Sequence, residues 1–278
     1  MRREFAGEAL GTFLLVLFGC GAVAVSVLFH AHRELMSVAL AWGTGVALAI
    51  YLTRHLSCAH LNPAVSVAMA IGGRMSVRKL PVYLGGQFAG AVLAGLAVYA
   101  LFGPSIAAHE QGLGIVRGTA ASVKTAMIFG EFYPNPDLTA RVSLPLAMAA
   151  EGFGTFLLVL MVFALTEGCN VGRPDAALAP VFIGLTVTAI ICLIAPLTQA
   201  GLNPARDLGP RLVAWAMGWG AAAFPDRVGG FLHVYVLAPL AGGAAAALFF
   251  VRVLEPLMKQ PAEPCDCCGP ARRADPPG

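Results

Sequence analysis

The stretch GLNPARDLGP (residues 201–210) places an arginine and an aspartate inside a strongly apolar chain. Its tripeptide Asn-Pro-Ala occurs once more, in HLNPAV (residues 60–65), where no arginine follows. Asparagine is a favoured N-cap. Proline is favoured at the first helical position, because a backbone N–H there would have no hydrogen-bond partner within the helix. Each copy therefore predicts the start of a helix, and only one of the two starts carries charge.

The composition around both copies is typical of a membrane protein. The 278 residues are 58% hydrophobic and 12% charged, whereas soluble domains carry about 25% charged residues. A membrane span needs roughly 20 apolar residues. The apolar segments that begin at Asn62 and Asn203 are shorter and predict half-helices that cross only part of the bilayer. Full spans are expected at 5–29, 36–54, 81–102, 144–166, 178–198 and 231–254.

The chain also repeats itself. EALGTFLLVL (8–17) returns as EGFGTFLLVL (151–160), and each half reads as span, span, half-helix, span. Because three spans are an odd number, the second half enters from the opposite side, and the repeats are inverted about a pseudo-twofold axis in the membrane plane. We therefore expect an all-α membrane protein with six transmembrane helices and two re-entrant half-helices. Its parts are a first repeat at 1–143, a second repeat at 144–256 and a polar, disordered cytoplasmic tail at 257–278.

The distribution of charge predicts the orientation. With both termini in the cytoplasm, eleven lysines and arginines lie on the inner side and seven on the outer side. Because positive charge favours the cytoplasmic side, we expect a multi-pass protein of the plasma membrane, the inner membrane in a bacterium, with both termini inside. The net charge of +3 includes no basic run, which argues against nucleic acid as a partner.

The sequence offers little support for metal, cofactor or enzyme chemistry. Three of the seven cysteines cluster at Cys265, Cys267 and Cys268. Such a cluster could bind a metal or carry a lipid, but it lacks the paired spacing of a zinc site and no histidine follows it. No nucleophile–base pair and no metal-ligand set is visible, so neither a cofactor nor enzymatic activity is expected.

The two helix starts have a further use. Inversion brings them together near the bilayer centre, where exposed backbone must be buried in protein or face a water-filled path. The side-chain oxygens of Asn62 and Asn203 can accept backbone N–H bonds, which leaves their amide N–H groups free to donate into the path. The positive dipole ends of the two helices favour an oxygen acceptor and repel cations. Carbonyls are expected along the same wall from extended backbone at 58–61 and 199–202, which includes Cys58, Ala59, His60, Gln199, Gly201 and Leu202.

These motifs resemble those of a known family. AHLNPAV and GLNPARDLGPRLVAWAMGWG are similar to the paired motifs of the aquaporin and glycerol-facilitator (major intrinsic protein) family, over about residues 4–256. The resemblance implies an aquaporin-like fold with one pore per subunit, small neutral solutes and, usually, a homotetramer. Features that resemble the glycerol-conducting branch are Asp207, Arg211, the pair Pro239-Leu240 and EFYPNP at 131–136.

The same resemblance makes Arg206 the filter arginine, which donates hydrogen bonds to solute hydroxyls and repels cations. A buried arginine at membrane depth costs roughly 2.5–3.5 kcal/mol unless it is paired or hydrated, so packing alone is an unfavourable role. By position, Trp42, Ile191 and Ala200 complete the filter, with Trp42 as an apolar wall for a carbon backbone. This set departs from bacterial glycerol facilitators. It resembles plant nodulin-like intrinsic proteins, which pass glycerol, water and some small uncharged hydroxylated solutes.

Two intramembrane carboxylates, Glu8 and Glu151, occupy equivalent places in the two repeats. Such groups suggest a proton relay by default, but the resemblance implies that they accept backbone N–H bonds and hold the carbonyl-bearing segments. His60 is expected to brace its loop in the same way. Asp207 either fixes Arg206 or caps the second half-helix, and the sequence leaves both possibilities open.

The expected function is a passive channel for glycerol and small neutral polyols, which also passes water. One alternative is a pore of the same fold for water or for neutral metalloid acids. Another is an ion-coupled secondary transporter, because inverted repeats with broken helices are also transporter anatomy. The sequence shows no second ionisable partner for Glu8 or Glu151, which argues against the transporter.

Overall fold

A computed structural model describes the chain over residues 1–32, 34–136, 141–224 and 230–260. Every regular element in these ranges is helical, and six helices are long and apolar enough to cross a membrane. The predicted fold class is therefore confirmed. The cysteine cluster predicted for the tail, at Cys265, Cys267 and Cys268, lies outside the described residues.

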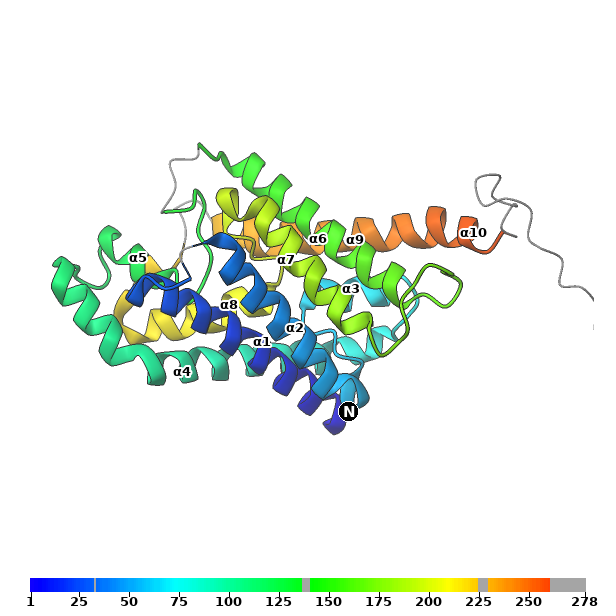
Figure 1. The fold of residues 1–278 in the computed structure, drawn as a ribbon, viewed down its shortest axis with the longest axis horizontal. Coiled ribbons are helices and arrows are strands. Elements are labelled where there is room, and N and C mark those ends of the chain that lie inside the picture. The colour runs from blue at the N-terminus through cyan, green and yellow to red at the C-terminus, as the bar shows by residue number, and fades with distance from the viewer. Residues whose placement is uncertain (33, 137–140, 225–229, 261–278) are drawn as a thin grey trace, which may run out of the picture.

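The N-terminus and α10 lie toward one end of the bundle, and α5 and the C-terminal end of α4 lie toward the other (Figure 1). The first five spans are α1 (Arg2–Phe29), α2 (Leu35–Ser57), α4 (Leu80–Leu113), α6 (Leu144–Thr166) and α7 (Ala179–Thr198). The last span is assembled from η5 (Leu232–Leu237), α9 (Ala238–Phe249), η6 (Phe250–Leu254) and α10 (Glu255–Met258). Short connecting elements are η1 (Val77–Lys79), η2 (Ala120–Ser122), α5 (Val123–Ala126) and η4 (Gly220–Ala223).

Two half-helices begin where the Asn-Pro-Ala triplets predict them. α3 (Pro63–Ile71) has 9 residues and α8 (Pro204–Ala214) has 11. At 1.5 Å per residue they are about 14 and 17 Å long, roughly half of a ~30 Å hydrocarbon core. In both, the preceding asparagine accepts backbone N–H bonds of the first turn. A π-turn, η3 (Trp215–Trp219), follows α8.

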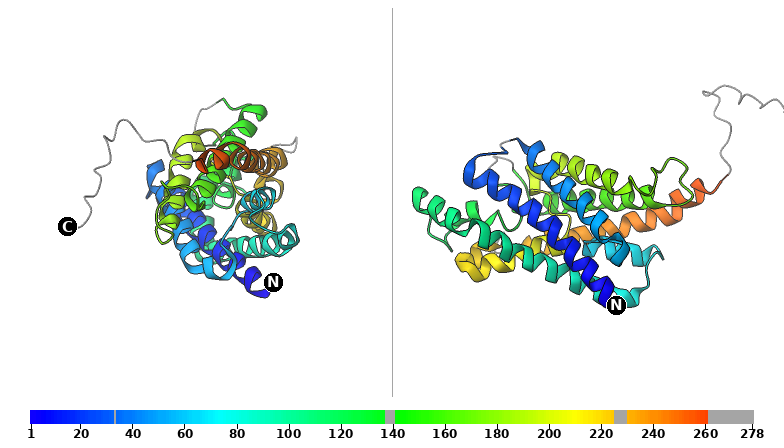
Figure 2. Two further views of the ribbon diagram at one scale, coloured as in Figure 1. Left: turned by 90° about the vertical axis from the view of Figure 1, so that its right-hand side faces the viewer. Right: turned by 60° about the horizontal axis from the view of Figure 1, so that its bottom comes forward.

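The helices pack in the same way in the two halves of the chain. α1 packs against α2 and α4, just as α6 packs against α7 and α9. Each half-helix lies against the last span of the other repeat, α3 on α9 and α8 on α4, while α2 meets α7. This exchange is the packing expected of inverted repeats. Figure 2 shows the bundle end-on, with the long helices running close to the view direction.

Glycines allow the closest of these contacts. A β-carbon on Gly184 of α7 would lie 2.3 Å from the carbonyl oxygen of Gly43 of α2. One on Gly242 of α9 would lie 1.9 Å from the carbonyl oxygen of Gly152 of α6. Because small residues let helix backbones approach closely inside a membrane, these pairs bring the spans near enough to enclose a narrow interior.

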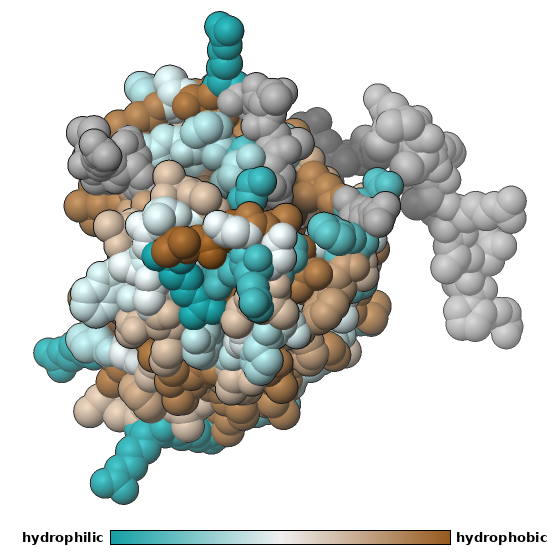
Figure 3. All heavy atoms as spheres, turned by 90° about the vertical axis from the view of Figure 1, so that its left-hand side faces the viewer, coloured by the Kyte–Doolittle hydropathy of each residue, from teal (hydrophilic) through white to brown (hydrophobic). Residues whose placement is uncertain are grey.

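α4 is longer than predicted. The expected span ended at residue 102, but the helix runs to Leu113 and has 34 residues, or about 51 Å. It continues beyond its apolar stretch because Glu110 in its last turns pairs with Arg117 of the following loop, and Gly114 closes it in the left-handed conformation. Figure 3 views the molecule from this end, where hydrophilic and hydrophobic residues are intermixed.

Candidate pore and filter

A cavity of about 420 Å³ lies inside the bundle. Its walls come from α1, α2, α3, α6, α7 and α8, from the loops that precede the half-helices, from the turn after α3 and from the loop between α6 and α7. Along α2 the lining extends from Trp42 to Arg54, about 18 Å of helix. The cavity is therefore elongated along the spans. The predicted pore residues that line it are Trp42, Cys58, Ala59, His60, Asn62, Ile191, Ala200, Gly201, Leu202, Asn203 and Arg206.

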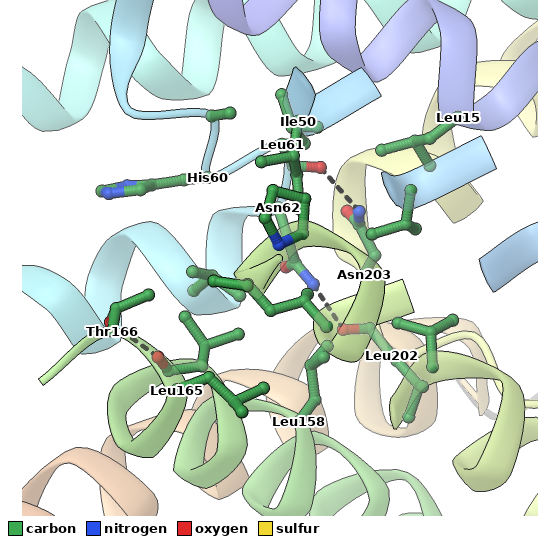
Figure 4. Close-up of a pocket in the computed structure, with 18 of the residues that line it drawn as sticks. Leu15, Ile50, His60, Leu61, Asn62, Leu158, Leu165, Thr166, Leu202 and Asn203 are labelled. Carbon is green, nitrogen blue, oxygen red and sulfur yellow. Dashed lines mark hydrogen bonds between the residues drawn. The ribbon is translucent and has the colours of Figure 1, made fainter. Parts of the chain in front are cut away.

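The two capping asparagines meet in the middle of this cavity (Figure 4). The Asn62 amide nitrogen donates to the Leu202 carbonyl at 3.0 Å, and the Asn203 amide nitrogen donates to the Leu61 carbonyl at 2.8 Å. The prediction that both amides are free to donate into the lumen is thus only partly right, since each gives one N–H to the opposite repeat. The second N–H of each amide is left for the cavity.

At six of the eight residues before the two triplets the backbone is left-handed and not extended as predicted. A positive φ costs a residue other than glycine about 1–3 kcal/mol, so tertiary contacts must hold these loops. Gln199, which was predicted to contribute a backbone carbonyl, is not among the residues that line the cavity, and its side-chain oxygen accepts the Phe132 backbone N–H at 2.7 Å. The φ values lie between 53° and 72° at Cys58, Ala59, Leu61, Gln199, Ala200 and Leu202.

The two buried carboxylates supply those contacts. Glu8 accepts the backbone N–H groups of His60 and Leu61 at 3.0 and 2.7 Å. Glu151 accepts those of Gly201 and Leu202 at 2.8 and 2.7 Å. With their N–H groups turned toward a carboxylate, the loops present carbonyls on their other side. Both glutamates are fully buried and, in the described residues, neither lines the cavity.

Equivalent tyrosines fix the start of each loop. The Tyr83 hydroxyl donates to the Ser57 carbonyl, and the Tyr235 hydroxyl donates to the Thr198 carbonyl. The His60 ring packs on Tyr83, with ring centroids 4.8 Å apart, and its Nδ1 lies 3.3 Å from the Ser66 hydroxyl. These contacts place His60 as a brace of its loop that also reaches the cavity wall.

At the predicted filter, the arginine and the tryptophan are stacked. The Arg206 guanidinium carbon lies 3.9 Å from the centroid of the Trp42 ring. Both side chains are buried, as are Ile191 and Ala200. The ring fits because Gly19 of α1 has no side chain: a β-carbon there would lie 2.1 Å from a Trp42 ring atom. The Arg206 Nη1 is buried and has no hydrogen-bond partner among the described residues, and an Asp207 carboxylate oxygen lies 3.9 Å from it.

Asp207 answers the question that the sequence left open. Its carboxylate forms an ion pair with Arg211 at 2.7 Å, and it lies 3.9 Å from the nearest Arg206 nitrogen. Arg211 also donates to the Ala223 carbonyl at 2.5 Å. The main contact of Asp207 is therefore with Arg211, one turn along α8, and not with the filter arginine.

One charged residue at the predicted filter was not predicted from the sequence. Glu131, in the loop between α5 and α6, is 4% exposed and forms an ion pair with Arg206 Nη2. Burial raises the pKa of the Glu131 carboxyl to about 7, against the attraction of Arg206, which lowers it. A signal was present, because Glu131 is the only charged residue between 125 and 136.

The described residues contain no group of three or more histidine, cysteine or carboxylate side chains that could hold a metal ion. Cys58 is exposed and lines the cavity as a free thiol. What the cavity offers a solute is therefore a small set of N–H donors, a row of carbonyls and apolar walls.

A family model and individual relatives match this chain. The model of the Major intrinsic protein family covers residues 1–250. The glycerol uptake facilitator protein of Pseudomonas aeruginosa is 40% identical over 241 residues, which cover 86% of this chain and 84% of that protein. The glycerol uptake facilitator protein of Escherichia coli K12 is 38% identical over 268 residues, which cover 96% of this chain and 92% of that protein.

A solved structure agrees with these matches. The X-ray structure of the aquaglyceroporin from Plasmodium falciparum superimposes with a TM-score of 0.79 and 28% sequence identity. The superposition covers 92% of this chain and 98% of that one. Together with the six spans and the paired half-helices, these matches identify a multi-pass membrane protein, and the chain belongs to the major intrinsic protein family.

Proposed function

We propose that the chain is a passive transmembrane channel for glycerol and small neutral polyols, which also passes water. The observation that carries the proposal is the cavity wall at the proposed filter, where the charged guanidinium of Arg206 is stacked on the apolar Trp42 ring and both residues line the cavity. A polyol has hydroxyls on one side and C–H groups on the other, so it can use both kinds of wall at once. The names of the two glycerol uptake facilitators support the same solute class.

The middle of the cavity is suited to neutral solutes. The N-termini of α3 and α8 meet there through Asn62 and Asn203, and each helix end carries roughly half a positive charge. A cation would lose hydration and meet two positive dipole ends. A hydroxyl oxygen would instead find the remaining amide N–H groups. The expected activity is therefore facilitated diffusion, not chemistry.

The finer assignments belong to the same proposal. Trp42, Ile191, Ala200 and Arg206 form the filter, and Glu8 and Glu151 support the carbonyl-bearing loops. The repeats are 1–143 and 144–256. The chain lies in the plasma membrane with both termini cytoplasmic, and it forms a homotetramer in which each subunit has its own pore.

Stopped-flow light scattering on proteoliposomes tests the proposal. Vesicles that contain the protein should equilibrate both glycerol and water faster than empty vesicles do. The physical reason is that both solutes cross a hydrated path instead of dissolving in hydrocarbon. If water flux rose while glycerol flux equalled that of empty vesicles, the protein would be a water channel and the glycerol proposal would be wrong.

A further inference from the structure

The end of the cavity that lies away from Arg206 is lined by three more arginines. Arg54 follows Trp42 by about 18 Å along α2, and Arg74 and Arg173 come from the turn after α3 and from the loop between α6 and α7. No aspartate or glutamate is among the described residues that line the cavity. We propose that this arginine mouth (Arg54, Arg74 and Arg173) binds a phosphorylated polyol, which blocks the path from that end. The inference rests on the proposed function, because the polyol part of the ligand would use the same cavity walls as the solute.

Contacts with one loop bring the three arginines together. Arg54 Nη1 donates to the Ala176 carbonyl at 2.8 Å. Ala176 lies three residues after Arg173, so their Cα atoms are at most about 11 Å apart. Arg74 forms an ion pair with Glu167, where the same loop leaves α6. The loop therefore contacts both Arg54 and Arg74 and carries Arg173 itself. Arg74 and Arg173 are exposed and Arg54 is half-buried, so a ligand can reach the mouth from solvent.

The arginine mouth carries positive charge that is not balanced by neighbouring residues. Arg74 is neutralised by Glu167 and by Glu255 of α10, which places the mouth at the end of the bundle where the N-terminus and α10 lie (Figure 1). Arg54 and Arg173 form no ion pair within the described ranges. Two guanidinium charges are therefore left for a ligand. They match the charge of a phosphate monoester, about −1.5 to −2 at pH 7.

The donors of the mouth suit a phosphate group. A guanidinium presents a planar fork of N–H donors that fits two phosphate oxygens at once. Arg54 gives only Nη1 to the Ala176 carbonyl among the described residues, so its other donors remain for a ligand. Because the three arginines come from three different segments, they can contact the several oxygens of a tetrahedral phosphate from different sides. Asp175, the carboxylate of the loop nearest to Ala176, does not line the cavity and does not compete for these donors.

The walls beyond the mouth explain why the ligand stops there. Toward the two asparagines the cavity is lined by Ile50, Leu158 and Leu165 (Figure 4). A phosphate group would lose its hydration against these side chains, which is costly for a charged group, so it stays with the arginines. The hydroxyl and C–H groups of the attached polyol are neutral and can extend into the cavity. A bound ligand therefore occupies the path of glycerol and of water alike.

Isothermal titration calorimetry on the purified protein measures the binding, with glycerol phosphate and inorganic phosphate as probes at one fixed ionic strength. Glycerol phosphate should bind more tightly, because its carbon chain adds contacts with the cavity walls. R173Q and R54Q should each weaken the binding of both probes by roughly tenfold, since each removes a charge-assisted contact. The glutamine of R54Q keeps an N–H donor for the Ala176 carbonyl. R54K restores the charge without the fork and should recover part of the affinity.

Proteoliposomes test the block. Saturating glycerol phosphate on both sides of the membrane should reduce the water and glycerol permeabilities of the native protein toward those of empty vesicles. In R54Q/R173Q the same concentration should leave most of that variant's own permeability. The matched control is R78Q, because Arg78 is exposed and follows Arg74 by four residues but does not line the cavity. It should bind and be blocked as the native protein is. Gel filtration of each purified variant reports whether it is folded.

The lipid composition of the vesicles separates two sources of the same chemical group, because the headgroup of phosphatidylglycerol is also a glycerol phosphate. We expect vesicles of phosphatidylcholine, with and without phosphatidylglycerol, to conduct equally until the soluble probe is added. A block by phosphatidylglycerol alone, relieved in R54Q/R173Q, would overturn the assignment to a soluble ligand and identify a lipid headgroup as the occupant.

Three outcomes would overturn the site itself. The first is no saturable binding of either probe to the native protein. The second is equal affinity in the native protein and in R54Q/R173Q. The third is binding that leaves both permeabilities of the native protein unchanged. If the native protein passed water and no glycerol, the proposed function would fail instead, and the calorimetry and the block of water flux would still test the arginine mouth.

Discussion

Arg206 and Arg211 lie on one half-helix, yet only Arg206 lines the cavity. Arg211 is 1% exposed and is fully engaged by Asp207, the Glu131 carbonyl and the Ala223 carbonyl. Two arginines and two carboxylates are thus buried together, with no net formal charge when all four are ionised. Balanced in this way, Arg206 can stay charged at a depth where an isolated charge would be costly.

The sequence predicted this region unevenly. Arg206 could be found because it follows a recurring motif, and Trp42 because its position before the first triplet resembles that of a filter aromatic. Glu131 was missed, although it is the only charged residue between 125 and 136, because it reaches Arg206 from a loop 75 residues away in the chain. The motif that contains it, EFYPNP, resembles a known loop but does not indicate which residue the carboxylate contacts.

Ala200→Phe tests the size of the proposed aperture. Ala200 is 5% exposed and lines the cavity, so an aromatic ring there should narrow the filter. We expect the variant to conduct linear polyols and exclude bulkier neutral solutes, measured with a solute panel in one vesicle swelling assay. Leu193→Phe is the control, because Leu193 is on α7 and 58% exposed. Unchanged selectivity in Ala200→Phe would place residue 200 outside the constriction.

The Glu131 carboxyl predicts a pH dependence. With a pKa of about 7, it is mostly ionised at about pH 8 and mostly protonated at about pH 6. Protonation removes the ion pair with Arg206, so glycerol permeability of the native protein should fall by roughly threefold or more over that range. The charged and titratable groups around it are Arg206, Asp207 and Arg211 of α8, Cys20 of α1 and Glu151 of α6.

Glycerol flux measured across this pH range in native and E131Q vesicles checks the dependence. E131Q cannot lose a proton at this position, so its flux should stay low and flat. A native profile that is also flat, or an E131Q profile that keeps the native slope, would show that another group is responsible.

Among the elements, the half-helices were predicted well and the loops before them were not. The tripeptide Asn-Pro-Ala specifies an N-cap and a first helical residue, so the start of each half-helix can be predicted from neighbouring residues alone. The left-handed backbone at Ala59 and Ala200 depends on Glu8 and Glu151, which belong to other helices. The extra length of α4 likewise depends on the tertiary pair of Glu110 with Arg117. Hydropathy alone predicts neither the left-handed loops nor the extra length of α4.

Gly184→Ala tests the contact between α2 and α7. The added β-carbon would lie 2.3 Å from the Gly43 carbonyl oxygen, so the helices must separate, at a cost of about 1–3 kcal/mol. The thermal unfolding midpoint of the purified variant should fall. Gly21→Ala is the matched control, since a β-carbon at Gly21 meets nothing within 4 Å and alanine is the better helix former. Equal midpoints for the two variants would contradict the close packing.

Over the whole molecule, the contacts that hold the half-helices are symmetric between the two repeats, whereas the residues proposed to select the solute are not. Both repeats use a glutamate, a tyrosine and a capping asparagine in the same way, so both half-helices are held equally. The proposed filter takes its charge from the second repeat alone, through Arg206, and the pseudo-equivalent residue of the first repeat is Val65. One constriction with one guanidinium is enough to select a solute. A second buried charge would add desolvation cost without adding a second kind of selectivity.

The whole molecule also distinguishes a channel from an ion-coupled transporter. One cavity runs past Arg206, the two asparagines and Arg54, and a channel, unlike an ion-coupled transporter, lets a solute move only down its own gradient. In vesicles with an imposed proton or sodium gradient, labelled glycerol should therefore reach the same concentration inside and outside, and never exceed it. The control is the same vesicles without an ion gradient, which should approach the same end point. Accumulation that needs the ion gradient would mean that the helices alternate between inward-open and outward-open states, and the continuous cavity would then be only one state of a transport cycle.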